Sequence, residues 1–224
     1  MAERSAIFVS LIFPVMMVFI FGSIMPSEYL TGVIPGLIGF SILTDSLFAV
    51  TAVASKYRLM HIFNQLSLTP LRRSEWLFSV FLWHVIIGAA SFAIIVGIGY
   101  FAFSANITLH LLIIPFIAFG ALLFVSMGLL IGTVAKSSES AGIIGNAVGF
   151  PMMVLTGTFF PVSFLPWYLQ QAVKVLPLYY FVQGMGDVMV TGDFNEGLLY
   201  LGVLIALAAG FFLAGTYLFR WREK

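Results

Sequence analysis

RLMHIFNQLSLTPLRRSEW, residues 58–76, is a polar stretch long enough to interrupt a chain that is otherwise largely apolar. Its first half has apolar residues at the spacing i, i+3, i+4 and i+7, namely Leu59, Ile62, Phe63 and Leu66. The polar residues between them are Arg58, His61, Asn64 and Gln65. This pattern predicts a short amphipathic helix lying along a membrane surface, with one face toward apolar material and the other toward water.

The second half of the stretch predicts a break and a new helix. Thr69 can cap a turn with Pro70 at its first position, where a missing N–H costs nothing. The charged residues Arg72, Arg73 and Glu75 follow before apolar sequence resumes at Trp76. Basic residues next to a membrane often only hold topology or attract anionic lipid. A surface for a protein partner is favoured, because the stretch is long, helical in pattern, capped, and mixes amide side chains with charge.

The composition places the chain in a membrane. Hydrophobic residues make up 61% of the 224 residues, charged residues only 8%, and the mean hydropathy is +1.10. Soluble domains carry roughly 25% charged residues, so the chain is an integral membrane protein. It has no cysteine, which excludes disulfides, thiolate catalysis and Cys-ligated metals. The first apolar run is too long for the core of a signal peptide, and we expect it to be retained as a span.

Apolar runs predict an all-α membrane protein with six transmembrane helices. About 20 apolar residues are needed to cross a bilayer. The run 77–135 has no Asp, Glu, Lys or Arg but is about twice that length, so we place a turn at its polar cluster, residues 104–108. The whole chain, 1–224, is read as a single domain with spans at about 5–27, 33–55, 77–102, 110–134, 141–160 and 197–219.

The basic residues predict the orientation. With six spans both termini lie on one side, and every Lys and Arg except Lys174 falls on that side, together with the stretch 58–76. By the positive-inside rule, this side and both termini are cytoplasmic, in a multi-pass protein of the cell membrane.

Prolines interrupt the apolar sequence after the start of span five. We expect a helix to about residue 158, a turn, a short amphipathic helix over 166–176, and a second short helix that returns toward the membrane. The residues that mark this region are Pro161, Pro166, Trp167, Pro177 and Tyr179.

Asp45 and His84 are ionisable residues at comparable depth in adjacent predicted spans. Asp45 lies roughly 16 Å from the end of its span and His84 roughly 12 Å, at 1.5 Å per residue. An ionisable group near the bilayer centre is a functional candidate. Two interpretations stay open: a structural cluster with Thr44 and Ser46, or a role in a translocation pathway.

Motifs for catalysis or cofactors are missing from the sequence. There is no H-E-x-x-H, no G-x-x-x-x-G-K-[ST], and the histidines His61, His84 and His110 fall in three separate regions. Gly39-Phe40-Ser41 resembles the G-x-S of an intramembrane protease, but no histidine follows His110. We therefore expect no enzymatic activity, no bound cofactor or metal and no nucleic-acid partner; if ATP is used, another chain must bind it.

Small residues recur four apart in three predicted spans: Gly128 and Gly132; Ala141, Gly145 and Gly149; and Ala206, Gly210 and Ala214. This spacing lets membrane helices approach closely. It fits packing within one chain or an interface between subunits.

The chain resembles the ABC-2 type permeases, the membrane subunits of ABC exporters of drugs, polysaccharides and lipids. The strongest match is GFPMMVLTGTFFPVSFLPWYLQQAVKVLPLYY, residues 149–180, with its Phe-Phe-Pro, Leu-Pro-Trp and Leu-Pro-Leu-x-Tyr steps. Residues 68–76 and the Phe-Pro step within residues 8–21 are also similar, and the resemblance covers essentially the whole chain.

The resemblance implies a dimer, of identical or different permease subunits, with a pair of cytosolic ABC ATPase subunits beneath that bind ATP and Mg. It implies that residues 58–75 form a coupling helix seated in the ATPase, through Arg58, His61, Asn64, Gln65, Thr69, Pro70, Arg72, Arg73 and Glu75. The region 161–190 would be an outward re-entrant hairpin. Family members usually have an amphipathic elbow helix before span one, whereas only residues 1–4 precede it here.

The expected function is therefore a permease subunit that exports an apolar or amphipathic substrate of the drug, lipid or glycolipid class. Asp45 is the only Asp, Glu, Lys or Arg well inside a predicted span, which disfavours a strongly charged substrate. The alternatives are an ion- or proton-coupled carrier that uses Asp45 and His84, and a membrane scaffold without transport. Membrane lipid is the remaining expected partner.

Overall fold

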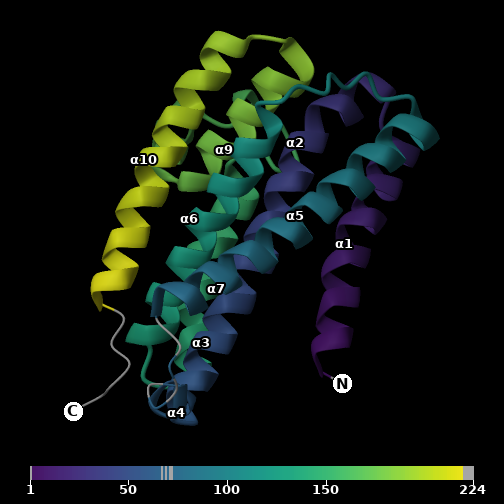
Figure 1. Cartoon of the computed structure of the whole chain (residues 1–224). Coiled ribbons are helices and arrows are strands. Elements are labelled where there is room, and N and C mark those ends of the chain that lie inside the picture. The colour runs from purple at the N-terminus through teal and green to yellow at the C-terminus, as the bar shows by residue number, and fades with distance from the viewer. Residues whose placement is uncertain (1, 67, 69, 71–72, 219–224) are drawn as a thin grey trace.

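The computed structural model describes residues 2–66, 68, 70 and 73–218, and that part of the chain contains helices and no strand (Figure 1). The main helices are α1 (Ala2–Ile24), α2 (Ser27–Leu43), α3 (Ala49–Leu59), α4 (Ile62–Leu66), α5 (Arg73–Phe103), α6 (Ile113–Val134), α7 (Ser138–Leu155), α8 (Trp167–Ala172), α9 (Pro177–Gly186) and α10 (Phe194–Leu218). Two π-helical turns, Thr44–Phe48 and Asp187–Thr191, and two 3₁₀ turns, Val162–Phe164 and Val173–Val175, connect them.

Four helical stretches of the described chain are long and apolar enough to cross a membrane: Ser27–Leu59, Glu75–Phe103, Ile113–Val134 and Phe194–Tyr217. A shorter apolar helix, Ile12–Ile24, lies before them. The all-helical, membrane-spanning class predicted from composition is therefore confirmed.

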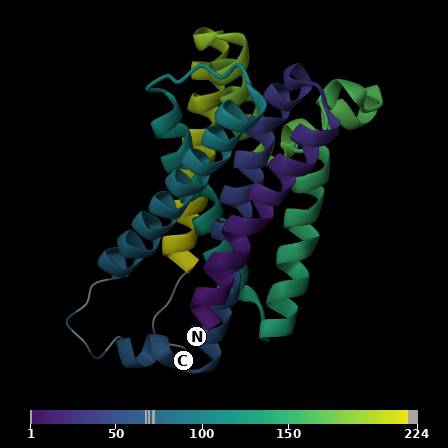
Figure 2. The same cartoon turned by 90° about the vertical axis from the view of Figure 1, so that its right-hand side faces the viewer.

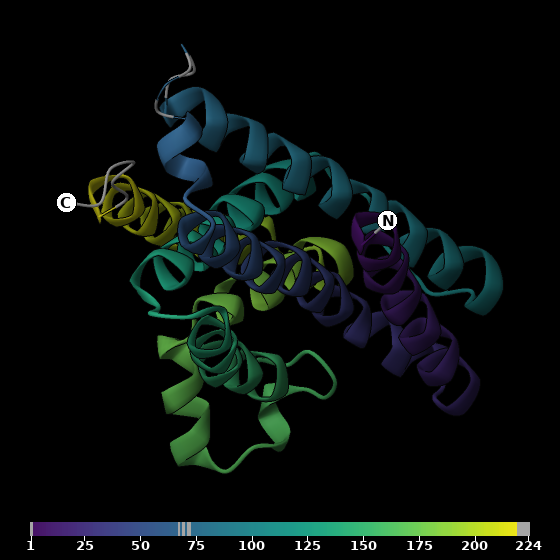
Figure 3. The same cartoon turned by 90° about the horizontal axis from the view of Figure 1, so that it is seen from below.

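Two of these stretches form the centre of the bundle. Ser27–Leu59 is 72% buried and α6 is 67% buried over their most apolar windows, against 28% for α5 and 22% for α10. Seen from below, α2 and α3 occupy the middle, with α10, α5, α1 and α7 around them (Figure 3). Helix α6 contacts α2, α3, α5, α7, α9 and α10, and the core gathers around it.

Glycines allow α6 to lie directly against α3. A Cβ added at Gly128 would lie 2.6 Å from the carbonyl oxygen of Leu47, and one added at Gly132 would lie 2.7 Å from the Cβ of Ala54. No side chain fits in such a space. The pair predicted to bring helices together therefore packs within the chain, as do Gly145 and Gly149, which face Phe48.

The two ends of the bundle differ. Helix α4 lies across the bundle axis at the end where α1 starts and α10 stops (Figure 2). At the opposite end are the non-helical residues 104–110 and the segment that contains α8 and α9. The turn predicted over residues 104–108 is confirmed. Ser137 and Ser140 form a reciprocal capping box at the start of α7.

Helix boundaries differ from the predicted spans in two places. The second span was predicted from residue 33, but α2 begins at Ser27, directly after the turn at Pro26. The predicted amphipathic helix over 58–66 is not continuous: α3 ends at Leu59, and His61 adopts a left-handed conformation with φ 53° before α4 begins. Helices commonly stop at a residue in this conformation, so Leu59 and Ile62 belong to different helices.

Candidate functional site

Phe63 is the buried aromatic side chain of α4, and Leu66 packs against the same cluster. Phe63 is 4% exposed, and its ring lies 5.8 Å from Tyr57 of α3 and 5.4 Å from Trp76 of α5, edge-on to both. The same cluster includes Val50 and Ala54 of α3, Leu77 of α5, and Val125 and Leu129 of α6. Edge-to-face pairs add about 0.5–1.5 kcal/mol each to the burial itself. Phe63 therefore links α4 to α3 and α5, within a cluster to which α6 also contributes.

The polar residues of α4 form a surface at the end of the bundle. His61 and Gln65 are exposed and Asn64 is half-buried. The carbonyl of His61 accepts hydrogen bonds from the N–H groups of Asn64 and Gln65, at 3.1 and 3.2 Å, and so starts the helix. Pro70 and Glu75 continue the exposed surface. Thr69 and Arg72, and the side chain of Arg73, lie outside the part of the chain that the structure describes.

Arg58 was predicted to belong to that surface, but its guanidinium faces α6. Nη1 donates hydrogen bonds to the carbonyl of Thr133 and, at 2.9 Å, to the carbonyl of Ala135. These carbonyls lie at the C-terminal end of α6, where backbone oxygens lack helical partners and the helix dipole is negative. The residue thus joins α3 to the turn between α6 and α7.

Asp45 and His84 are brought together, as their predicted depths suggested. Asp45 lies in the π-helical turn Thr44–Phe48 and is 6% exposed. The His84 ring hydrogen-bonds the carbonyl of Val80 through Nδ1 at 2.7 Å and lies close to the backbone of Asp45. Thr44 does not join this group, because its hydroxyl donates to the carbonyls of Phe40 and Ser41 at 2.9 Å. Single π-turns within helices are frequent at functional sites.

Several serines are buried within the bundle, among them Ser41, Ser46 and Ser91, of which only Ser46 was expected to belong to a cluster with Asp45. The Oγ atoms of Ser41, Ser46 and Ser91 are buried without a hydrogen-bond partner in the described part of the chain. A buried polar group without a partner costs about 1–3 kcal/mol. Serines are common in apolar runs, and no sequence signal separates these three from hydroxyls that bond to their own helix.

Aromatic rings join α1, α2 and the segment after α7. Phe13 stacks on Phe40 at 5.1 Å, and Phe159 lies 5.7 Å from Phe40 and 6.2 Å from Phe21. Phe13 is 37% exposed, so one side of this cluster is open to the surroundings of the chain. It is an apolar surface without ionisable groups.

The segment of predicted hairpin residues divides into an exposed and a buried part. Pro161 and Pro166 precede the 3₁₀ turn Val162–Phe164 and α8, and Pro177 starts α9. Trp167 is 77% exposed, whereas α9 packs against α2, α6 and α10. Tyr179 of α9 lies 6.1 Å from Tyr200 of α10, ring to ring.

Acidic groups gather at the end of the bundle opposite α4. Burial raises the pKa of Asp187 to about 6, and the neighbouring carboxylates of Glu196 and Asp193 add to the shift. Asp193 also accepts hydrogen bonds from the N–H groups of Asn195 and Glu196, at 3.1 and 3.2 Å, which caps α10. In residues 2–66, 68, 70 and 73–218, no three His, Asp or Glu side chains are close enough to hold a metal ion.

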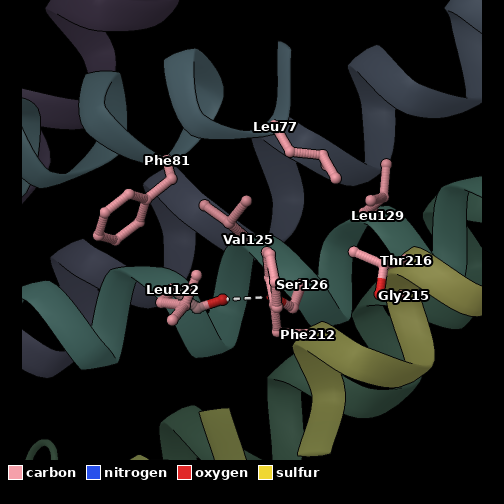
Figure 4. Close-up of a pocket in the computed structure, with 9 residues that line it drawn as sticks. All are labelled: Leu77, Phe81, Leu122, Val125, Ser126, Leu129, Phe212, Gly215 and Thr216. Atoms are coloured by element: carbon pink, nitrogen blue, oxygen red, sulfur yellow. Dashed lines mark hydrogen bonds between the residues drawn. The ribbon is translucent and has the colours of Figure 1, made fainter. Parts of the chain in front are cut away.

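A small groove lies between α5, α6 and α10, on the α4 half of the bundle (Figure 4). Its only side-chain hydroxyls are already bonded to backbone: Ser126 donates to Leu122 at 2.7 Å and Thr216 to Leu213 at 3.0 Å. The groove is apolar and offers no chemical group. Its lining residues are Leu77, Phe81, Leu122, Val125, Ser126, Leu129, Phe212, Gly215 and Thr216.

Comparisons with known proteins point to one family. The family model described as ABC-2 type transporter matches residues 1–190. Nodulation protein J of Bradyrhizobium diazoefficiens is 26% identical over 208 residues, which cover 91% of this chain and 78% of that protein. Nodulation protein J of Rhizobium meliloti is 30% identical over 109 residues, 49% of this chain and 42% of that protein.

A further relative is the linearmycin resistance permease protein LnrN of Bacillus subtilis, 24% identical over 180 residues. That match covers 79% of this chain and 47% of the relative, so this chain spans less than half the length of two of these relatives.

Proposed function

Because the chain belongs to the ABC-2 type transporter family, we propose that it is the membrane subunit of an ATP-driven exporter whose ATPase subunits are separate chains. The single observation that carries the mechanism is the placement of α4, a helix laid across the end of the bundle and fixed by Phe63 to three other helices. A partner that grips the polar side of α4 can move those helices. ATP and Mg are held by that partner, and this chain does no covalent chemistry.

The proposed orientation places α4 in the cytoplasm. Lys56 and Arg58 lie in the last turn of α3, which leads into α4, and Lys136 lies between α6 and α7. Glu28 is in the first turn of α2, and Asp187, Asp193 and Glu196 lie between the end of α9 and the first turn of α10, which are the opposite ends of their helices. Positive residues concentrate on the cytoplasmic side of membrane proteins. Both termini are then cytoplasmic and the α8–α9 segment faces outward. With α1 and α7 counted beside the four long apolar stretches, the chain crosses the membrane six times, and α8–α9 forms the outward hairpin.

In the proposed cycle, closure of two ATPase subunits pushes on the two α4 helices of a permease dimer, which switches the cavity between inward and outward access. We propose His61, Asn64, Gln65 and Pro70 as contact residues, together with Glu75 and with Thr69, Arg72 and Arg73, for which the proposal rests on the sequence alone. The substrate is apolar or amphipathic, of the drug, lipid or glycolipid class. Support for this class comes from the open aromatic cluster at Phe13 and from the relative named for resistance to linearmycin.

Co-purification tests this function. The tagged chain, extracted from the membranes of its own organism, is expected to bring down an ATP-hydrolysing subunit. Replacing His61 and Gln65 together with Glu should abolish that capture while membrane insertion persists. Lys174→Glu, at the opposite end, is the matched control and should leave capture unchanged. Capture that survives the double substitution contradicts docking at α4, and absence of any ATPase from wild-type preparations contradicts the exporter.

A proton-coupled carrier is the second candidate, favoured by the placement of His84 close to the backbone of Asp45, a buried residue in a π-turn. The two functions differ in their energy source. Asp45→Asn removes the carboxylate charge at similar size. An exporter should keep ATP hydrolysis by the assembled complex in this variant, whereas a carrier should lose proton uptake into vesicles that carry a pH gradient and no ATP.

A further inference from the structure

We propose that Arg58 is a positioning residue that locks α3 and α4 to the turn between α6 and α7, so that movement of α4 is delivered to α6 and α7 as well as to the two helices that flank it. This inference rests on the proposed function for its role in transport. The lock itself is a property of this chain alone. Its basis is the bridge from the Arg58 guanidinium to the carbonyls of Thr133 and Ala135, more than 70 residues away in sequence.

Above Arg58, α3 and α6 have no room to slide past each other. A Cβ added at Gly128 would lie 2.6 Å from the carbonyl oxygen of Leu47. One added at Gly132 would lie 2.7 Å from the Cβ of Ala54 and 2.9 Å from the carbonyl oxygen of Thr51. The buried hydroxyl of Thr51 donates to the carbonyl of Gly128 at 3.2 Å. Close-packed interfaces of this kind do not deform gradually. We therefore expect α3 and α6 to move together as one rigid body.

Arg58 extends the contact between α3 and α6 to the end of the bundle at which α4 lies. A planar guanidinium has five donors in a fixed fork and can hold two carbonyls at once. Lys56, two residues earlier, is exposed. Without Arg58, the last turn of α3 and the attached α4 would lose this polar link to the end of α6 and would keep the apolar contacts of Tyr57, Phe63 and Leu66. Arg58 therefore decides whether α4 and the α6–α7 turn move together.

From the α6–α7 turn the path continues into α7. Ala135 ends α6, and two residues later the Ser137–Ser140 capping box starts α7. Further along, Gly149 of α7 lies against the ring of Phe48, where an added Cβ would be 2.5 Å away. Helix α7 leads to the turn at Gly157 and Thr158, whose backbone lies against Gly36 of α2. Movement of α4 can therefore reach α7, which runs toward the end of the bundle opposite α4.

Spin-label distances test the lock. The chain has no cysteine, so two introduced cysteines are the only labelling sites. Gln65→Cys on α4 and Glu139→Cys at the start of α7 are both exposed positions. In lipid nanodiscs without any partner, this pair should give one narrow distance distribution. Arg58→Gln should broaden it, Arg58→Lys should restore part of the narrowing, and Lys56→Gln, with the same change in charge, should leave it unchanged.

A second pair separates the lock from general loss of structure. Gln65→Cys with Phe78→Cys spans α4 and α5, which Phe63 and Trp76 connect independently of Arg58. Its distribution should stay narrow in Arg58→Gln. An unchanged 65–139 distribution in Arg58→Gln overturns the proposal, and so does equal broadening of both pairs, which would make Arg58 a general stabiliser. Because no ATPase is present, these outcomes are independent of whether the exporter function holds.

The full complex tests the transmission. For this test the first label is placed at Met60, which is exposed and is not one of the proposed contact residues. When the captured ATPase is trapped with ADP and vanadate, the wild-type 60–139 distance should match that of the nucleotide-free complex, because both labels lie on one rigid body. In Arg58→Gln the two states should differ. A change of the wild-type distance between the two states overturns transmission through Arg58, even if the lock exists at rest.

Discussion

Removal of the Phe63 side chain should release α4 from the bundle. In Phe63→Ala, the ring that lies 5.8 Å from Tyr57 and 5.4 Å from Trp76 is lost from a site that is 4% exposed. Buried Phe→Ala substitutions cost about 3–5 kcal/mol. The lower value corresponds to roughly a 100-fold rise in the opening equilibrium of α4, at 1.4 kcal/mol per factor of ten.

Amide hydrogen exchange measures this release. The N–H groups of Asn64 and Gln65 bond to the carbonyl of His61, and that of Leu68 bonds to Gln65, so these amides report the state of α4. Their exchange should accelerate by roughly the same two orders of magnitude, while amides at the centre of α6 keep their protection. Gln65→Ala, at an exposed position, is the control. Exchange in Phe63→Ala at the wild-type rate would refute the view that this one ring fixes α4.

Three further predictions concern other parts of the bundle. Gly132→Ala places a methyl group 2.7 Å from the Cβ of Ala54, so the free energy of unfolding of the detergent-solubilised protein should fall by about 1–3 kcal/mol. Gly210→Ala is the control, because nothing lies within 4 Å of its added Cβ, and it should be neutral or mildly stabilising. Equal effects of the two substitutions would contradict the packing of α3 on α6. Because the pKa of Asp187 is raised to about 6 from 3.8, the folded state binds more protons than the unfolded state between about pH 4 and 6, and the stability falls as the pH rises through this window. Asp187→Asn should therefore raise the Tm at pH 7.5 and make the Tm less dependent on pH. A lower Tm of this variant at pH 7.5 would show that the fold stabilises the carboxylate instead. Ser137→Ala removes the capping box of α7 and should cost about 0.5–2 kcal/mol, measured as faster exchange in the first turn of α7; unchanged exchange there would show that the cap contributes nothing.

Local signals in the sequence were sufficient for the elements that depend on local physics. Apolar length predicts helices that can cross a membrane, and the polar residues 104–108 predict the turn. Each of these depends on hydrogen bonds or burial within a few residues. The depth of Asp45 and His84 also followed from the rise per residue, and the structure places them in contact.

Features that depend on distant partners could not be read in the same way. Arg58 looked like one of several surface cations, because nothing near it in sequence shows that the end of α6 lies beside it. The break at His61 escaped because a histidine in the left-handed conformation leaves the apolar spacing intact. The π-turn at Asp45 adds one residue to a helix without changing its composition. Packing in three dimensions decides each of these features.

Crosslinking from Gln65 tests most directly whether the ATPase subunit binds to α4. A photoreactive amino acid at this exposed position, irradiated in native membranes, should form a covalent adduct with a cytosolic ATPase subunit and should be shielded from reagents added outside the cell. Adducts with lipid alone, or labelling of the same position by a membrane-impermeant reagent from outside, would contradict the account.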